Sequence, residues 1–136
     1  MIPKSILWSA LGLFLLQASP SFAQSDPLFR EVPAAESGIE HTNTVVETPE
    51  RFLWHFDYYY TGSGVAIGDL DRDGRPDLVF GGQDSPSSVY LNEGSLRFRD
   101  ISPTCGIRAH PAWTNGVNLV DLNADGWLGS YHSSGG

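Results

Sequence analysis

The chain has 136 residues and carries 16 acidic against 8 basic side chains, a formal net charge of −8. This acidic surplus argues against a nucleic-acid-binding protein, because contact with phosphate backbones needs surface patches of Lys and Arg. The single cysteine excludes an intrachain disulfide as the device that stabilises the fold.

The first 23 residues have the three parts of a secretory signal peptide. Lys4 gives a positive start, residues 6–16 form an apolar run, and residues 21–23 offer a small-x-small cleavage site. We expect cleavage between Ala23 and Gln24, a secreted or periplasmic product, and no membrane span after cleavage. The alternative is a retained anchor, for which the run is short. Loss of Lys4 leaves seven Arg against sixteen acidic residues, a formal charge of −9.

An N-terminal segment follows over residues 24–61. Residues 24–50 are polar and contain one strand-like piece at 29–32. Residues 52–60 predict a second strand, because aromatic side chains alternate there and would line one face. We expect these rings to be buried against neighbouring strands; the alternative is an exposed platform for a sugar or a peptide. The alternating rings are Phe52, Trp54, Phe56, Tyr58 and Tyr60.

Four carboxylates then stand at positions 1, 3, 5 and 9 of a nine-residue loop that has Gly74 at position 6. Alternate carboxylates can converge on one point if a cation neutralises them, and Ca²⁺ accepts six to eight oxygen ligands in flexible geometry. Glycine suits the sharp turn because it adopts a positive φ without strain. The loop predicts a calcium site; the alternative is a solvated polar turn. The four carboxylates are Asp69, Asp71, Asp73 and Asp77.

This loop is not an EF-hand. An EF-hand needs a Glu at position 12 and a helix on each side, whereas position 12 here is Phe80. The flanks, residues 64–68 and 78–82, are short apolar runs bounded by glycine, which predict strands. The carboxylates therefore lie in a connection between two strands.

The same pattern returns 52 residues later without a gap. Residues 64–74 align with residues 116–126, and Asn123 stands where the first loop has Asp71. Self-similarity at about 20–50 residues is typical of solenoids, propellers and repeat arrays. Asp121, Asn123 and Asp125 thus form a candidate second site.

Between the two loops the sequence predicts two more strands. Residues 87–91 are one strand, residues 92–94 a turn, and residues 95–101 alternate apolar and polar side chains as a half-buried strand does. One repeat then holds about four strands, which is the content of a β-propeller blade.

The run Gly-Val-Ala-Ile-Gly-Asp-Leu-Asp-Arg-Asp-Gly-Arg-Pro-Asp-Leu-Val-Phe resembles the FG-GAP or VCBS repeat of integrin-α-like β-propellers. The segments at 89–94, 98–101, 106–107 and 113–117 are similar to a secreted bacterial branch related to cartilage acidic protein, in which such repeats precede an ASPIC or UnbV domain. The resemblance covers residues 28–128. It implies an all-β fold of antiparallel propeller blades. It also implies Ca²⁺ ligands, namely Asp69, Asp71, Asp73, Asp77 and the main-chain carbonyl of Arg75.

The second loop departs from the pattern at its ninth position, where Gly129 stands in place of Asp. We expect a weaker second site and no outgoing strand after it, with a flexible tail at residues 134–136. The chain then encodes about one and a half blades, whereas propellers close with about four to eight. It is expected to be an N-terminal fragment of a longer protein; the alternative is a self-contained β domain that oligomerises to cover its edges.

The expected organisation is a signal helix at 1–23, the segment at 24–61, a first repeat at 62–112 and a truncated second repeat at 113–136. Cys105 is expected to be a small buried residue; the alternative is a free thiol that pairs between chains. The four histidines lack zinc-site spacing, and no serine-nucleophile motif occurs, so we expect no catalysis.

The sequence thus predicts an exported, calcium-binding structural and interaction module with a protein or glycan partner outside the cytoplasm. Two alternatives remain open. One is a glycan-binding module that uses the aromatic strand, and the other is the N-terminal piece of a propeller enzyme whose catalytic residues lie elsewhere.

Overall fold

The computed structural model describes residues 27–52, 54, 59–107 and 113–134. The chain divides into two units, residues 1–31 and residues 32–136. In the first unit the described residues, 27–31, form neither a helix nor a strand, so the strand expected at 29–32 is wrong. The expected signal helix lies outside the described residues.

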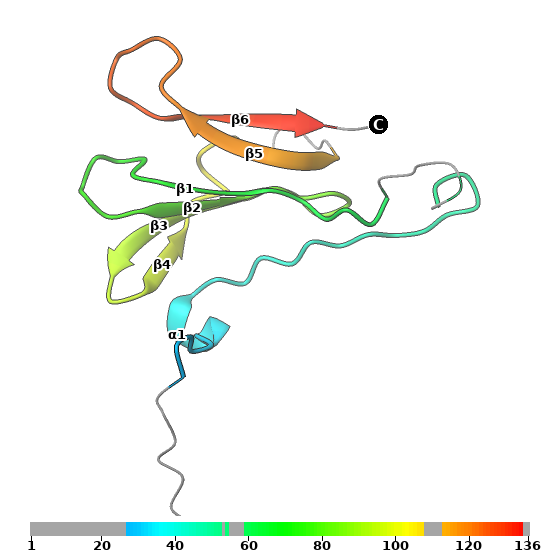
Figure 1. The fold of residues 1–136 in the computed structure, drawn as a ribbon, viewed down its shortest axis with the longest axis horizontal. Helices are drawn as coiled ribbons and strands as arrows, with labels where there is room; N and C mark the ends of the chain where they lie inside the picture. Colours follow the sequence, from blue (N-terminus) through cyan, green and yellow to red (C-terminus); the bar gives the residue numbers. More distant parts are fainter. Residues whose placement is uncertain (1–26, 53, 55–58, 108–112, 135–136) are drawn as a thin grey trace, which may run out of the picture. The chain divides into compact units, whose positions relative to one another are not determined.

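The regular secondary structure of the second unit consists almost entirely of antiparallel strands, as the sequence predicted (Figure 1). It opens with one short helix, α1 (Ala34–Ser37), which begins after Pro33 and ends at Gly38 with φ 77°. Glycine is suited to this left-handed position at a helix end. The helix was not predicted.

A four-stranded sheet follows in the order β1-β2-β3-β4, which we call the first sheet. Its strands are β1 (Val65–Gly68), β2 (Asp77–Phe80), β3 (Ser88–Gly94) and β4 (Arg97–Asp100). All four were predicted. The turn expected at residues 92–94 lies slightly later, at Ser95 and Leu96, because β3 extends to Gly94.

The remaining strands, β5 (Thr114–Val120) and β6 (Gly129–Ser134), form a separate antiparallel pair, which we call the hairpin. The expectation that no strand follows the second loop, and that Ser134 begins a flexible tail, is therefore wrong. The two loops occupy equivalent places: one joins β1 to β2 and the other joins β5 to β6. Four antiparallel strands and a second pair agree with partial FG-GAP-type propeller blades.

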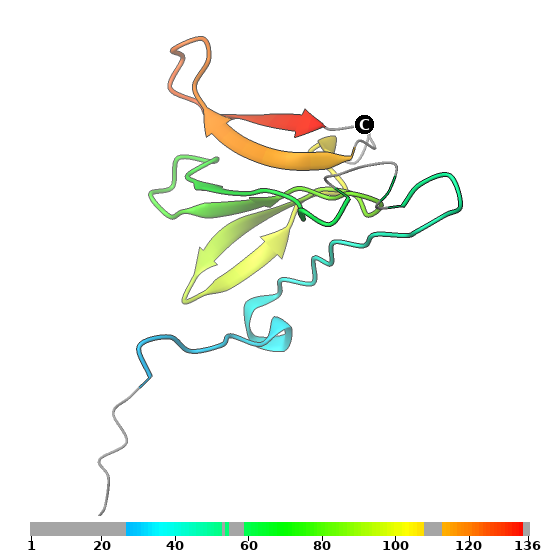
Figure 2. The ribbon, with the colours of Figure 1, turned by 45° about the vertical axis from the view of Figure 1, so that its right-hand side comes forward.

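The hairpin stacks on one face of the first sheet (Figures 1 and 2). A small core fills the space between them, in which Val79 is fully buried and Ala66, Val89 and Val117 are nearly so. Complete burial of a Val or Leu side chain contributes about 1.5–3 kcal/mol. The core therefore ties the two repeats together.

Beside this core lies a cavity of about 580 Å³, lined by β3, β6 and the chain around Ile101 and Ile107. Cys105 is among its lining residues, but its side chain is exposed, so the prediction of a buried cysteine is wrong.

The opposite face of the first sheet is partly covered by an extended segment, residues 39–44. The ring of His41 stacks on Phe80 at 5.0 Å between centroids, and the Glu40 amide donates to the Tyr90 hydroxyl at 3.2 Å. Asn43 exchanges hydrogen bonds with Gln83 at 2.8 and 2.9 Å.

The aromatic strand expected at residues 52–60 is not found where the structure describes it. Phe52, Trp54, Tyr59 and Tyr60 lie in bends and turns. The ring that is buried is Tyr59, which packs 5.0 Å from Trp113, whereas Trp54 is 85% exposed. Phe56 and Tyr58 lie outside the described residues.

Candidate metal centre

The first loop, residues 69–76, is closed by the pairing of its two ends. Gly68 and Asp77 face each other in the ladder between β1 and β2, so the chain leaves the sheet and returns at the same place. Within the loop, Arg72 has φ 64° and Gly74 has φ 84°. These left-handed residues curl the backbone tightly enough for its amides to face inward.

Aspartate side chains accept these inward-facing amides. The Asp73 amide donates to Asp69 Oδ1 at 3.1 Å and to Asp71 Oδ1 at 3.2 Å, and the Gly74 amide donates to Asp69 Oδ2 at 2.9 Å. Such side-chain to backbone bonds are the reason that Asp is favoured in turns. The aspartate side chains therefore hold the loop backbone in place and also give the loop its negative charge.

Asp77 is the buried member of the group, with 0% exposure. Its Oδ2 accepts the Leu70 amide at 2.7 Å and its Oδ1 accepts the Asn92 amide at 2.8 Å. A buried carboxylate is costly unless it is hydrogen-bonded, and two amides supply that compensation. Asp77 therefore joins β2, the loop and β3 at one point.

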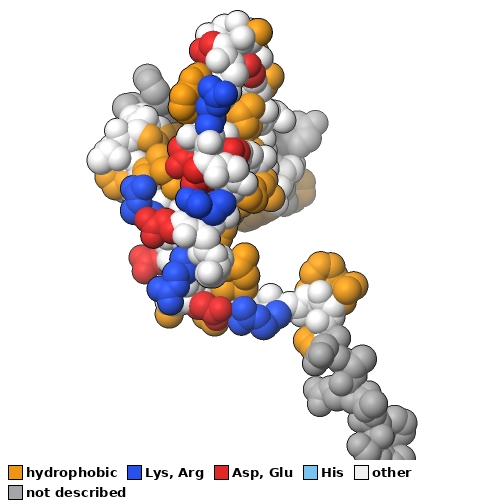
Figure 3. Space-filling model, turned by 90° about the vertical axis from the view of Figure 1, so that its left-hand side faces the viewer, with side chains coloured by type: hydrophobic (Ala, Val, Ile, Leu, Met, Phe, Trp, Pro, Cys, Tyr) orange, Lys and Arg blue, Asp and Glu red, His pale blue; other side chains and the backbone are white. Residues whose placement is uncertain are grey.

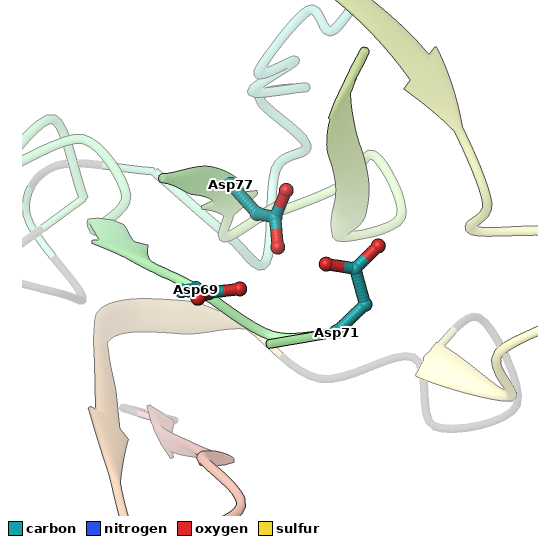
Figure 4. Close-up of side chains that lie close together, drawn as sticks. All are labelled: Asp69, Asp71 and Asp77. Carbon is teal, nitrogen blue, oxygen red and sulfur yellow. The ribbon is translucent and has the colours of Figure 1, made fainter. Parts of the chain in front are cut away.

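Asp69, Asp71 and Asp77 converge: one oxygen from each lies within 4.8 Å of the others (Figure 4). Two unit charges about 4 Å apart repel by about 4 kcal/mol at an effective dielectric of 20, so the arrangement favours a bound cation. Carboxylate oxygens are the donors that hard divalent cations take, and Ca²⁺ tolerates irregular geometry best. The donor set therefore fits a calcium ion.

Asp73 is not part of this cluster, although the sequence predicted it as a ligand. Its Oδ1 accepts the Arg75 amide at 2.9 Å, and its Oδ2 forms an ion pair with the Arg75 guanidinium. Arg75 Nε also donates to the Asn92 carbonyl at 2.7 Å, which holds the guanidinium at the loop.

Asn92 is a residue of the site that sequence reasoning missed. Besides its amide bond to Asp77, its side-chain Nδ2 donates to the Pro76 carbonyl at 2.9 Å. The sequence predicted a turn at Asn92-Glu93-Gly94. That prediction gave no reason to expect that the Asn92 side chain supports the end of the loop.

The second loop repeats the first at the level of single atoms. The Asp125 amide donates to Asp121 Oδ1 at 3.2 Å and to Asn123 Oδ1 at 3.3 Å, and the Gly126 amide donates to Asp121 Oδ2 at 2.8 Å. The hydrogen bond from the Trp127 amide, with that from the Asn123 side chain, lowers the pKa of Asp125. Ala124 and Gly126 have φ 57° and 85°, as their counterparts do.

The second loop nevertheless has fewer carboxylates than the first. Gly129 offers no side chain at the place of Asp77, and within the described residues the only acidic cluster that could hold a metal is that of Asp69, Asp71 and Asp77. The Asn123 amide donates to Asp125 at 2.8 Å, which uses one of the remaining carboxylate oxygens.

The two loops approach each other through side chains. The Arg72 guanidinium lies over the Trp127 ring at 5.2 Å, a cation–π contact between the repeats. Figure 3 views the molecule from the loop end and shows acidic and basic side chains interleaved with apolar ones. A cation in the first loop would therefore act on a surface shared by both repeats.

Across the part of the chain that the structure describes, no helix has the length and apolar character needed to cross a membrane.

Comparison with known proteins bears on the same segment. The FG-GAP-like repeat family matches residues 69–128, from the first carboxylate of the first loop to the end of the second loop. Cartilage acidic protein 1 of Xenopus tropicalis is 29% identical over 68 residues, and that of Mus musculus is 28% identical over 68 residues. Each match covers 50% of this chain and 10% of the relative. No solved structure matches the chain.

The family match, the relatives and the antiparallel stack of two equivalent loop-bearing units agree with one another. Residues 69–128 of the chain are thus similar to the FG-GAP-like repeat family.

Proposed function

We propose that this chain is an exported calcium-binding interaction module. An FG-GAP repeat suggests a β-propeller-like interaction module. We further propose that the first loop binds calcium, that the chain is exported, and that its partner lies outside the cytoplasm. The proposal includes no catalytic step, because it assigns the clustered carboxylates of the first loop to the cation.

The observation that carries the proposal is the convergence of Asp69, Asp71 and Asp77. We assign these three carboxylates as ligands, with Asp73 and the Arg75 carbonyl as the further ligands that the family resemblance implies. Ligation by Asp73 would require it to leave its ion pair with Arg75. The net charge of −8 supports a cation-loaded protein, since bound Ca²⁺ offsets part of the repulsion.

Calcium is expected to stabilise the fold, because a ligand that binds only the folded state raises the free energy of unfolding. Thermal melts of the purified chain should show a higher Tm in millimolar Ca²⁺ than in chelator. Asp71→Asn should remove most of this gain, since it deletes one converging charge without changing the side-chain shape. Asp73→Asn should remove less of it.

The matched control is Glu93→Gln, which alters an exposed carboxylate that is not one of the three converging ones and that pairs with Arg99 at 2.8 Å. It should keep the full gain. Equal melting in Ca²⁺ and in chelator for the unmodified chain would refute the calcium proposal. Export is tested separately, by N-terminal sequencing of the chain recovered outside the cytoplasm, which should begin at Gln24.

A further inference from the structure

Asn92 on β3 lies where the ladder between β2 and β3 ends. Leu78 faces Tyr90 in that ladder, so two residues further along the same register Pro76 comes opposite Asn92. Proline has no backbone N–H and cannot donate to the carbonyl opposite it. The regular backbone pairing of the first sheet therefore cannot continue onto the first loop.

Side chains make the connection that the ladder cannot. Arg75 Nε donates to the Asn92 carbonyl at 2.7 Å, in place of the N–H that Pro76 lacks. The Asn92 amide donates to Asp77 Oδ1 at 2.8 Å, and the Asn92 side chain donates from Nδ2 to the Pro76 carbonyl at 2.9 Å. The end of the first loop is thus held to β3 by hydrogen bonds that all include Asn92.

The side chain of Asn92 is itself fixed by the strand that carries it. Its Oδ1 accepts the Gly94 amide at 2.9 Å, where the register of β3 and β4 shifts between Asn92 and Gly94. An Asn side chain that accepts the amide two residues later forms an Asx-turn. Gly94 has φ 90°, a left-handed conformation that suits glycine. Both polar atoms of the Asn92 side chain are therefore engaged, one by β3 and one by the first loop.

Asn92 acts on the buried member of the proposed calcium site. Asp77 is fully buried, and its carboxylate accepts the Leu70 amide on Oδ2 and the Asn92 amide on Oδ1. The hydrogen-bond partners of a metal-ligating carboxylate set its orientation, and amides on both oxygens fix the plane of the group. A shift of Asn92 would therefore turn the Asp77 carboxylate relative to those of Asp69 and Asp71, with which it converges.

We propose that Asn92 is a positioning residue of the calcium site: its side chain holds β3 against the end of the first loop and so sets the affinity for the cation without ligating it. The inference rests on the proposed calcium site and adds to it a residue of another strand. By thermodynamic linkage the effect is reciprocal, so a bound cation also stabilises the hydrogen bonds that Asn92 makes. The first loop and the end of β3 therefore respond to the cation together.

The affinity of the purified chain for Ca²⁺, measured by isothermal titration calorimetry, tests the role of this side chain. Asn92→Ala removes the bonds to Pro76 and Gly94 and should weaken Ca²⁺ binding by about 10- to 100-fold, as the loss of a partner of a metal ligand does. Asn92→Asp keeps an acceptor for the Gly94 amide but cannot donate to the Pro76 carbonyl. It should also weaken binding, although its added negative charge alone would attract the cation.

Asn43→Ala is the matched control. Like Asn92, the Asn43 side chain donates one hydrogen bond and accepts another, here with Gln83 at 2.8 and 2.9 Å. Gln83 follows the end of β2 that lies away from the first loop. The substitution should lower the Tm and leave the Ca²⁺ affinity unchanged, which separates a loss of stability from a loss of positioning.

Amide hydrogen exchange, followed by NMR on the unmodified chain, tests the reciprocal effect without a substitution. The Asn92 and Gly94 amides should exchange at least about fivefold more slowly in Ca²⁺ than in chelator. This slowing should exceed that of the Gln83 amide, which donates to Asn43. The measurement also decides the case in which Asn92→Ala does not fold.

An unchanged Ca²⁺ affinity in Asn92→Ala, or tighter binding in Asn92→Asp, would overturn this inference and leave the calcium proposal standing. Equal slowing of exchange at Gly94 and Gln83 would do the same. An unmodified chain that binds no Ca²⁺ would overturn both.

Discussion

At the residue scale, Asp77 is a buried side chain that connects three parts of the first repeat. It is fully buried, and both its oxygens accept backbone amides, one from the loop and one from β3. Its role in the fold is therefore separable from any role in holding a cation.

Asp77→Asn should lower the free energy of unfolding by about 2–4 kcal/mol. The NH₂ group of Asn is a donor, and it would face a backbone N–H that no longer has an acceptor. The loss should be present in chelator as well as in calcium. Urea denaturation of the two proteins measures it, with Glu93→Gln as the control. An unchanged unfolding midpoint in chelator would contradict the structural role of Asp77.

Arg75 is a second residue whose effect on cation binding can be measured by itself. Its guanidinium pairs with Asp73 beside the acidic cluster, so it would compete with a divalent cation for the Asp73 carboxylate. Arg75→Ala keeps the carbonyl and removes the charge, and should tighten Ca²⁺ binding about fourfold. Isothermal titration calorimetry measures this; weaker binding would show that Arg75 supports the site by its bond to Asn92 rather than opposing it.

At the scale of elements, residues 39–44 hold to the first sheet through a titratable contact. Burial lowers the pKa of His41, with a smaller opposing effect from a hydrogen bond with the Gly81 backbone. The His41 ring stacks on Phe80, and its Nδ1 lies 3.1 Å from Ser88 Oγ. The segment is thus attached by a histidine that the fold keeps neutral.

Because the folded-state pKa of His41 lies below the unfolded value of about 6.5, the unfolded chain binds more protons as the pH falls through that range. The stability that neutral His41 contributes to the fold is fully present above about pH 6.5 and is lost as the pH falls below that value. We expect the urea midpoint to fall between pH 7.5 and pH 5.5, and His41→Gln to reduce the slope. A slope that is the same in the variant would assign the pH dependence to other groups.

Most of the elements could be predicted because the signal was local. The apolar runs beside the first loop gave β1 and β2, and the 52-residue repeat placed β5 and its loop. β6 was missed because Gly129-Ser130-Tyr131-His132-Ser133-Ser134 has little strand propensity, and its pairing with β5 comes from the tertiary context.

The candidate site could be predicted in outline. Spacing alone identified Asp69, Asp71 and Asp77, since alternate positions of a tight loop point the same way. It could not show that Asp73 pairs with Arg75, because a neighbouring guanidinium competes for that carboxylate. The burial of Asp77 depends on an amide from β3, 15 residues further along the chain, which no local pattern reveals.

At the scale of the molecule, two repeats share one core and one loop surface. Val117 of the second repeat is buried against the first sheet, and Arg72 of the first loop lies over Trp127 of the second. A cation that fixes the first loop would therefore also fix the position of Arg72, and through it the contact between the repeats. The acidic balance of the whole chain favours such a cation over an anionic partner.

The proposed calcium site requires a divalent cation among the carboxylates of Asp69, Asp71 and Asp77. A crystal structure of the exported chain grown in millimolar Ca²⁺, with Tb³⁺ substituted for its anomalous scattering, would locate this cation. We expect a metal peak bounded by these three side chains, with oxygen ligands at about 2.3–2.6 Å from Ca²⁺. A loop with the same backbone and no metal peak at that position would contradict it.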